Sequence, residues 1–193
     1  MRFMNFHYVK RYRMEMNLLR WQAPVLRLPH GYLLVPWHHS LTQHHAEVKY
    51  RSFRDGIDAQ VFPCLGELEG CERLMSEIKA KDGFVPEATW LVEYIGDGLR
   101  YAEYCGTIQA VRTQKNRSSI QNVGVLAEHR GLGLGKGLML ASLLGMQQVG
   151  ITQVGLEVTA ENRSAVQLYH QLGFRSVRTL YKSVELACAP AGS

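Results

Sequence analysis

Apolar residues recur along this chain at two spacings, and each spacing predicts a different element. A recurrence every three or four residues predicts helices over residues 40–53, 68–81, 134–149 and 163–172. Alternating or short continuous apolar runs predict strands over residues 25–35, 89–94, 101–112, 119–127, 154–159 and 176–185. The predicted order is a strand, two helices, three strands, and then alternating helices and strands.

Local signals sharpen several of these boundaries. Ser40 and Gln43 have the spacing of a capping box, in which two side chains satisfy exposed amides at the start of a helix. Gly96-Asp97-Gly98 and Lys115-Asn116-Arg117 separate the three central strands as hairpin turns would. The pattern as a whole predicts an α/β fold with a single mixed, mostly antiparallel sheet and helices on both faces.

Length and charge indicate one domain with distinct ends. At roughly 150 residues per domain, 193 residues make about one, and 46% apolar against 20% charged residues argues against disorder. Residues 1–20 hold five basic residues and one acid (5 − 1 = +4), while the rest of the chain carries 17 − 16 = +1. We therefore expect a basic lead-in over 1–20, a folded domain over 21–188 and a tail over 189–193.

Several classes of protein are not expected. The longest apolar stretch, residues 138–146, contains a glycine and is shorter than the roughly 18 residues of a membrane span. Charges throughout residues 1–22 argue against a secretory signal, and four cysteines without a C-x-x-C pair fit reduced thiols in the cytoplasm. A role on RNA would depend on the basic lead-in alone, so nucleic acid is not an expected partner.

The strongest chemical signal is a glycine-rich junction between a predicted strand and the following helix. Four glycines fall within seven residues, at positions 131, 133, 135 and 137. Glycine lets a backbone approach a ligand closely, and the first turn of a helix leaves amides unpaired at the positive end of its dipole. The junction therefore predicts a pyrophosphate site. Neither the P-loop pattern nor the dinucleotide pattern G-x-G-x-x-G is met.

Arg130, Gly133 and Gly135 instead form the pattern R-x-x-G-x-G, and here the sequence resembles the GCN5-related N-acetyltransferase (GNAT) superfamily. A second match, over residues 156–174, combines a strand, Asn162, a short helix and Leu-Gly-Phe. Together the two matches cover a cofactor half of about residues 120–175. Residues 1–90 match no pattern of the family, so the resemblance leaves the acceptor undefined.

The resemblance implies a GNAT fold and an enzyme, an acetyl-CoA-dependent N-acetyltransferase that needs no metal. The acceptor would be a primary amine on a small molecule, a peptide N-terminus or a lysine, and a homodimer is compatible with the family. The backbone of residues 123–125 would bind pantetheine and the acetyl oxygen, as an oxyanion hole does. The implied cofactor-binding residues are Val123, Gly124, Val125, Arg130, Gly131, Leu132, Gly133, Leu134, Gly135, Lys136, Asn162 and Tyr169.

Acetyl transfer needs an acid for the leaving thiolate and a means of deprotonating the amine. By resemblance Tyr169 is the acid, since a phenol with a pKa near 10 can protonate a thiolate whose conjugate thiol has a pKa near 8.5. Its spacing from Ala165 and Leu172 is also that of a core residue, so packing remains an alternative. Asn162 is expected to cap the following helix as well as to bind the cofactor.

The base is less defined. By resemblance it is Glu157, five residues before Asn162; Glu93 and Glu103 on earlier strands are alternatives, as is deprotonation without a protein base.

A metal site is not expected at the four clustered histidines. No carboxylate or cysteine stands at ligand spacing beside His38, His39, His44 and His45. A different class of function stays open, namely a degenerate domain that binds acyl-CoA as a sensor or partner without turnover.

Overall fold

The computed structural model describes residues 6–96 and 102–185. The strands are β1 (Phe6–Asn17), β2 (Tyr32–Pro36), β3 (Trp90–Tyr94), β4 (Glu103–Gln114), β5 (Arg117–Val125), β6 (Gln153–Thr159) and β7 (Arg175–Glu185). The α-helices are α1 (Thr42–Phe53), α2 (Ile57–Val61), α3 (Leu68–Lys79), α4 (Leu134–Gln148) and α5 (Arg163–Leu172). Asp97 and Gly98 of one predicted turn, and the predicted tail over 189–193, lie outside the described residues.

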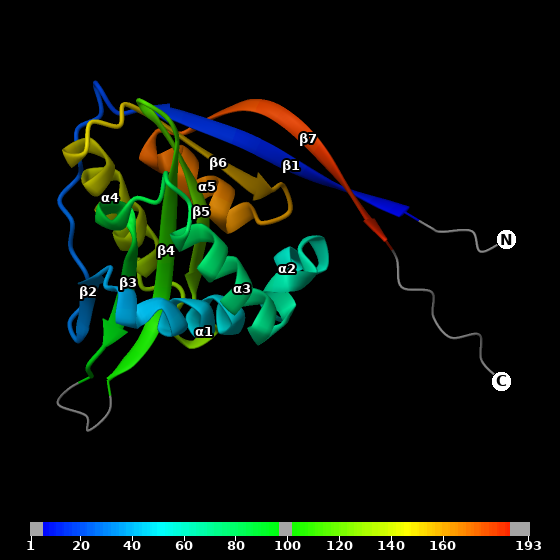
Figure 1. Ribbon diagram of the computed structural model, residues 1–193. Coiled ribbons are helices and arrows are strands. Elements are labelled where there is room, and N and C mark those ends of the chain that lie inside the picture. The colour runs from blue at the N-terminus through cyan, green and yellow to red at the C-terminus, as the bar shows by residue number, and fades with distance from the viewer. Residues whose placement is uncertain (1–5, 97–101, 186–193) are drawn as a thin grey trace, which may run out of the picture.

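The strands form one sheet in the order β2-β3-β4-β5-β6-β1-β7 (Figure 1). Neighbouring strands are antiparallel except β5 and β6, which are parallel. The prediction of a mixed, mostly antiparallel sheet is therefore confirmed. β1 and β7 run side by side as a long ribbon that extends away from the helices (Figure 1).

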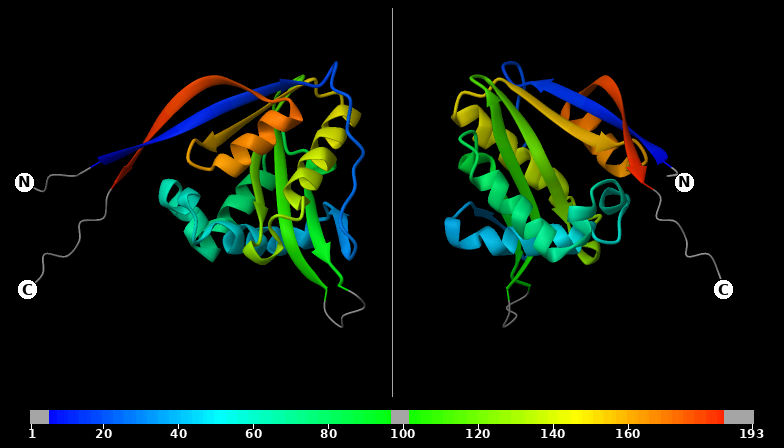
Figure 2. Two further views of the ribbon diagram at one scale, coloured as in Figure 1. Left: turned by 180° about the vertical axis from the view of Figure 1, so that it is seen from behind. Right: turned by 45° about the vertical axis from the view of Figure 1, so that its right-hand side comes forward.

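Helices cover both faces of the sheet, as predicted: α1 and α3 lie on one face, and α4 and α5 lie on the other (Figure 2). The main apolar core includes Ile108 of β4, Leu138 of α4 and Leu156 of β6. A second core under α1 and α3 includes Met75 and Val111. Burial of these apolar surfaces on both sides holds the sheet between its two helical layers.

The N-terminal residues form a strand within the sheet, which corrects the expectation of a separate basic lead-in over 1–20. β1 pairs with β6 on one side and with β7 on the other. Met14 and Met16 are buried, whereas Glu15 between them and Arg13 before them alternate toward the opposite face. Arg11 and Arg13 thus share one face of the strand with Glu15, and these charges conceal its apolar alternation.

Two further predictions at the front of the domain are corrected. The strand expected over 25–35 is shorter and begins at Tyr32, because Pro24 and Pro29 cannot donate to a strand ladder. The capping box at Ser40 and Gln43 is absent: Leu41 is the N-cap of α1 and makes no side-chain cap hydrogen bond. Ser40 lies instead in a 3₁₀ turn, His39–Leu41, that leads directly into α1.

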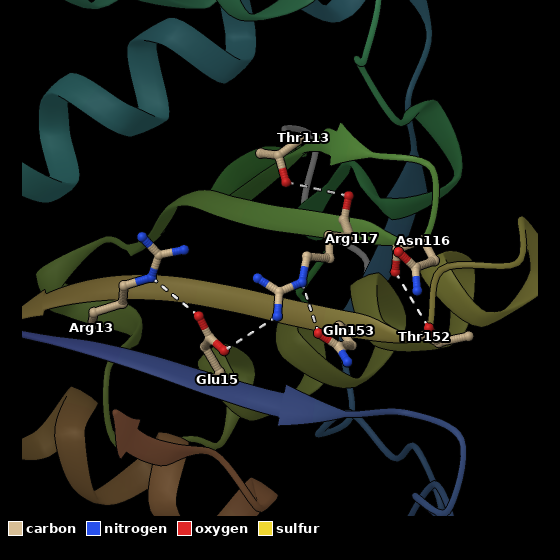
Figure 3. Close-up of polar contacts among 7 residues, drawn as sticks. All are labelled: Arg13, Glu15, Thr113, Asn116, Arg117, Thr152 and Gln153. Atoms are coloured by element: carbon tan, nitrogen blue, oxygen red, sulfur yellow. Dashed lines mark hydrogen bonds and ion pairs between the residues drawn. The ribbon is translucent and has the colours of Figure 1, made fainter. Parts of the chain in front are cut away.

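β5 and β6 pair only at one end, over residues 117–119 and 153–155. Figure 3 shows the polar contacts that fasten this end: Arg117 Nε donates to Gln153 Oε1 over 2.8 Å, and Arg117 Nη2 lies 3.9 Å from Glu15 Oε2 on β1. The amides of Thr152 and Gln153 both donate to the carbonyl of Asn116 at 3.0 Å. Beyond the fastened end the two strands have no ladder between them, and this splay positions the candidate site.

Candidate active site

Two adjoining cavities lie beside the splayed strands. The first, which we call the cradle cavity, has a volume of about 620 Å³ and surrounds the start of α4. The second, the outer cavity, has a volume of about 400 Å³ and is bordered by both β5 and β6. The described residues that line both are Phe53, Asp58, Val123, Asn162, Ala165 and Tyr169.

The glycine-rich loop forms the floor of the cradle cavity. Gly131 and Gly133 have φ of +79° and +82°, a left-handed conformation that favours glycine, and a Cβ at either position would meet no atom within 4 Å. Glycine is thus favoured at these two positions by the backbone conformation and not by a lack of space, since the space beside them is open. α4 begins directly after Gly133, and its first turn carries no acidic residue, so its unpaired amides meet no competing negative charge there.

Arg130 holds this loop in place. Its Nε donates to the carbonyl of Val125 over 2.9 Å, and its Nη2 donates to the carbonyl of Ser52 over 2.8 Å. The guanidinium therefore ties the loop to the end of β5 and to the last turn of α1. A role for Arg130 in positioning the cradle follows from these two bonds.

The structure brings most of the implied cofactor-binding residues together around the cradle cavity. Those that line it are Val123, Gly124, Val125, Arg130, Gly131, Gly133, Leu134, Gly135, Lys136, Asn162 and Tyr169. Leu132 is not among the lining residues and is 46% exposed. Because glycine flanks it on both sides, Leu132 lies on a loop whose path is set by its neighbours, and its side chain is left at the surface.

α5 places Asn162 and Tyr169 at the point where the cavities adjoin. Asn162 Oδ1 accepts from the amide of Ala165 at 3.3 Å, as an N-cap does, and Gly173 closes the helix with φ of +105°. Tyr169 is only 8% exposed, and burial raises the pKa of its hydroxyl, with the negative charge of Asp58 adding to that rise. Its ring also packs 6.0 Å from that of Phe174, so its ring is a packing element whatever its hydroxyl does.

The three carboxylates expected as base candidates lie in different surroundings. Glu157 lines the outer cavity, but its side chain is 46% exposed and its Oε2 lies 3.8 Å from Arg11 Nη2. Glu103 pairs with Arg51 at 2.9 Å and approaches His129 at 3.5 Å. Neither Glu93 nor Glu103 lines the cradle or the outer cavity. Of the three, Glu157 alone has access to either cavity.

Two charged residues that sequence reasoning missed also line the outer cavity. Asp58 lies in the first turn of α2, and its Oδ1 accepts a hydrogen bond from Thr159 Oγ1 at 2.9 Å. Arg11 of β1 is only 7% exposed, and its guanidinium lies 4.5 Å from the centre of the Phe62 ring. Burial lowers the pKa of Arg11, while Glu157 and Asp58 act in the opposite sense. Both residues come from elements that the sequence did not predict, so no local signal marked them.

The four histidines do not converge on one site. His45 is fully buried, its Nδ1 lies 2.8 Å from Thr107 Oγ1, and burial lowers its pKa to about 3. His38 contacts Ser40, and His44 lies 3.5 Å from Glu47 at the surface. Across residues 6–96 and 102–185, no group of three or more His, Cys, Asp or Glu side chains is arranged to hold a metal ion.

The fold and the cradle together define the class of protein. Residues 62–174 match the model of the Acetyltransferase (GNAT) family, which is more than half of the chain, and the chain belongs to that family. It is 50% identical over 136 residues to a mycothiol acetyltransferase of Thermobispora bispora, covering 66% of this chain and 46% of that protein. It is 34% identical over 74 residues to an N-alpha-acetyltransferase of Sulfurisphaera tokodaii, covering 38% of this chain and 44% of that protein.

Solved structures show the same fold. A GCN5-related N-acetyltransferase from Sphaerobacter thermophilus aligns with a TM-score of 0.68 at 22% identity, over 94% of this chain and 52% of that one. The chain spans less than half the length of the curated relatives described above. Within the part of the chain that the structure describes, no helix has the length and apolar character needed to cross a bilayer.

Proposed function

We propose that this protein transfers an acetyl group from acetyl-CoA to a primary amine by direct attack of the amine on the thioester. One observation carries the proposal: the cradle cavity at the start of α4 adjoins the outer cavity at residues of β5 and α5. A donor held by its phosphates at one end would therefore present its acyl end to an acceptor entering from the other.

The residues of the cradle cavity fit an acyl-CoA. The unpaired amides at the start of α4 and the open space beside Gly131 and Gly133 suit a pyrophosphate, and Lys136 at the rim adds a positive charge. On the side facing β6, the backbone of β5 beyond Ser119 has no strand partner, so its polar groups are free to bond an extended pantetheine arm. The same backbone would bond the acetyl oxygen as negative charge develops there.

The proposed acid is Tyr169, which lines both cavities. A phenol with a pKa of 10 or above is protonated at neutral pH, so the Tyr169 hydroxyl can give a proton to the thiolate as the carbon–sulfur bond breaks. The base expected from the resemblance is Glu157, whose side chain reaches the outer cavity. The three free cysteines among the described residues support our further proposal that the protein acts in the cytoplasm.

The experiment combines binding with turnover. Isothermal titration with acetyl-CoA tests the cradle, and release of the free thiol over a panel of primary amines tests transfer. We expect binding and acceptor-dependent thiol release. Binding without thiol release for any amine would contradict the proposal and favour a sensor or partner domain instead.

A further inference from the structure

The point where donor and acceptor would meet contains one carboxylate. Among the six described residues that line both cavities, Asp58 is the single acidic side chain, whereas Glu157 lines the outer cavity but not the cradle cavity. The reacting nitrogen has to reach the thioester carbon, so a group that removes its proton must lie within hydrogen-bond reach of that nitrogen, directly or through one water. The position of Asp58 meets this requirement better than that of Glu157.

Asp58 is held in a fixed orientation from a second element. Thr159 at the end of β6 is fully buried, and its hydroxyl donates to Oδ1 of Asp58 over 2.9 Å. Within the described residues Oδ2 has no hydrogen-bonding partner. One oxygen is thus anchored, and the other is available to a ligand. The hydrogen bond also joins the short helix α2 to the end of β6.

The charges around Asp58 favour a cation. The outer cavity is lined by one basic residue, Arg11, and by two carboxylates, Asp58 and Glu157, so its charged lining sums to 1 − 2 = −1. Arg11 lies closest to Glu157, at 3.8 Å, and Lys182 of β7 lies over the ring of Phe62, 4.0 Å from its centre. Arg11 therefore offsets one of the two negative charges of the lining. Lys182 is not itself a lining residue, and an ammonium group of the acceptor would offset the other charge.

The rest of the outer cavity is largely apolar on the side of the helices. Phe53, Phe62, Leu65 and Leu74 line it there. An acceptor whose amine sits beside an apolar group could place the amine at Asp58 and the apolar group against this wall. An acceptor with a carboxylate next to its amine would meet two protein carboxylates instead.

We infer that Asp58 is a catalytic residue that binds the acceptor as an ammonium ion and takes its proton, and that the preferred acceptor is a cationic primary amine flanked by an apolar group. This inference rests on the proposed acetyl transfer. Oδ2 accepts a proton from the ammonium, and the nitrogen lone pair then forms the bond to the acetyl carbon. The carbon–sulfur bond breaks, and the thiolate takes a proton from Tyr169.

In these reaction steps two protons leave the nitrogen and one arrives at the sulfur. The proton on Asp58 passes to solvent through the outer cavity, which returns the carboxylate to its ionised form. The second nitrogen proton restores the Tyr169 hydroxyl. The balance is one amide, one free thiol and one proton released for each ammonium and thioester consumed.

The test compares two acceptors that differ in what they need from a base. Phenethylamine carries an aromatic group and an alkylamine that is protonated at pH 7, since such amines resemble lysine with a pKa near 10.4. Hydroxylamine is a small nucleophile that is largely unprotonated at that pH. Asp58→Asn retains an oxygen for Thr159 but removes the basicity. We expect it to reduce kcat/KM for phenethylamine by on the order of 10²–10⁴-fold and to change that for hydroxylamine only a few-fold.

Two controls accompany this variant. Asp55 lies three residues before Asp58, and its carboxylate is 86% exposed and paired with Arg54. Asp55→Asn removes this carboxylate and should leave both reactions unchanged. Glu157→Gln removes the other carboxylate of the outer cavity and should affect phenethylamine less than Asp58→Asn does. Titration with acetyl-CoA checks that each variant retains the folded cradle.

The outcomes separate this inference from the proposed function. If the unaltered protein releases thiol with neither acceptor, the proposed acetyl transfer fails on these probes and the inference fails with it. If it turns over and Asp58→Asn acts like the unaltered protein, or if both acceptors are slowed equally, Asp58 is not the proton acceptor. A larger loss for Glu157→Gln than for Asp58→Asn would assign that role to Glu157.

Discussion

Arg130 Nη2 donates to the carbonyl of Ser52 over 2.8 Å, which joins residues that are 78 positions apart in the chain. The same guanidinium bonds the carbonyl of Val125 through Nε. The conformation of the glycine-rich loop is therefore linked to α1, a helix that precedes the cofactor half of about residues 120–175.

Arg130→Met should loosen this link. Hydrogen bonds from a charged donor contribute about 1.5–3 kcal/mol each, and partial exposure places these two toward the lower end. We expect a lower free energy of unfolding by urea and weaker acetyl-CoA binding in titration. Arg130→Lys should recover only part of the affinity, because an ammonium cannot reproduce the two diverging bonds of the guanidinium. Unchanged binding in Arg130→Met would remove Arg130 from the support of the cradle.

Gly133 and Gly135 should respond differently to substitution. Gly133→Ala forces a side chain into a left-handed conformation and should cost about 1–2 kcal/mol of stability, measured by thermal or urea unfolding. At Gly135 a Cβ would meet only Leu168 at 3.7 Å and Val125 at 4.0 Å, which are ordinary contacts. Gly135→Val should therefore fold well but bind acetyl-CoA more weakly, because its branched side chain would occupy the cradle. Unaltered affinity in that variant would contradict the assignment of the loop to the pyrophosphate.

Tyr169→Phe keeps the ring that packs beside Phe174 and removes only the hydroxyl. If the hydroxyl protonates the leaving thiolate, turnover should fall on the order of 10²–10⁴-fold while acetyl-CoA affinity changes little. Since the pKa of the hydroxyl is raised, Tyr169 should stay protonated, and remain an acid, through mildly alkaline pH. Equal turnover in both proteins would show Tyr169 to be a packing residue.

Lys49 gives a prediction about stability and pH. Its amine is fully buried, lacks a hydrogen-bond partner among the described residues, and has its pKa lowered by burial to about 7. The unfolded chain, with a lysine pKa near 10.4, binds this proton more strongly than the folded one between about pH 7 and pH 10. The contribution of Lys49 to the free energy of unfolding should therefore rise with pH across that window.

Lys49→Met removes the titrating group and keeps most of its length. Urea unfolding at pH 7 and at pH 9 should show a smaller pH dependence for this variant than for the unaltered protein, together with higher stability at pH 7. If the two proteins gain stability equally between these pH values, the buried amine does not govern the dependence.

The part of the fold that follows local rules was predictable from the sequence. α5 has the predicted bounds, because Asn162 caps one end, Gly173 closes the other and the apolar spacing between them is helical. The loop glycines likewise indicated a cradle before α4. In each case the signal lies within a few residues of the element that it specifies.

The residues that sequence reasoning missed depend on contacts between distant elements. β1 alternates buried methionines with charged residues, and the charges suggested a solvated segment until its partners β6 and β7 were known. Asp58 lies on a helix of five residues and accepts a hydrogen bond from Thr159, about a hundred positions later. Neither pairing leaves a local pattern, so the acceptor end of the site could not be predicted.

The place of β1 between β6 and β7 has a consequence for the order in which the chain can assemble. β7 joins the sheet through β1, so residues 6–17 and 175–185 have to find each other across most of the sequence. Closing so long a loop is slow, and contacts of this kind lengthen folding times. During synthesis the β1 segment leaves the ribosome well before β7, so it gains its second neighbour only after β7 has been made. Arg11 belongs to β1 and lies opposite Thr159 of β6, so the outer cavity acquires this lining residue only when β1 has paired with β6.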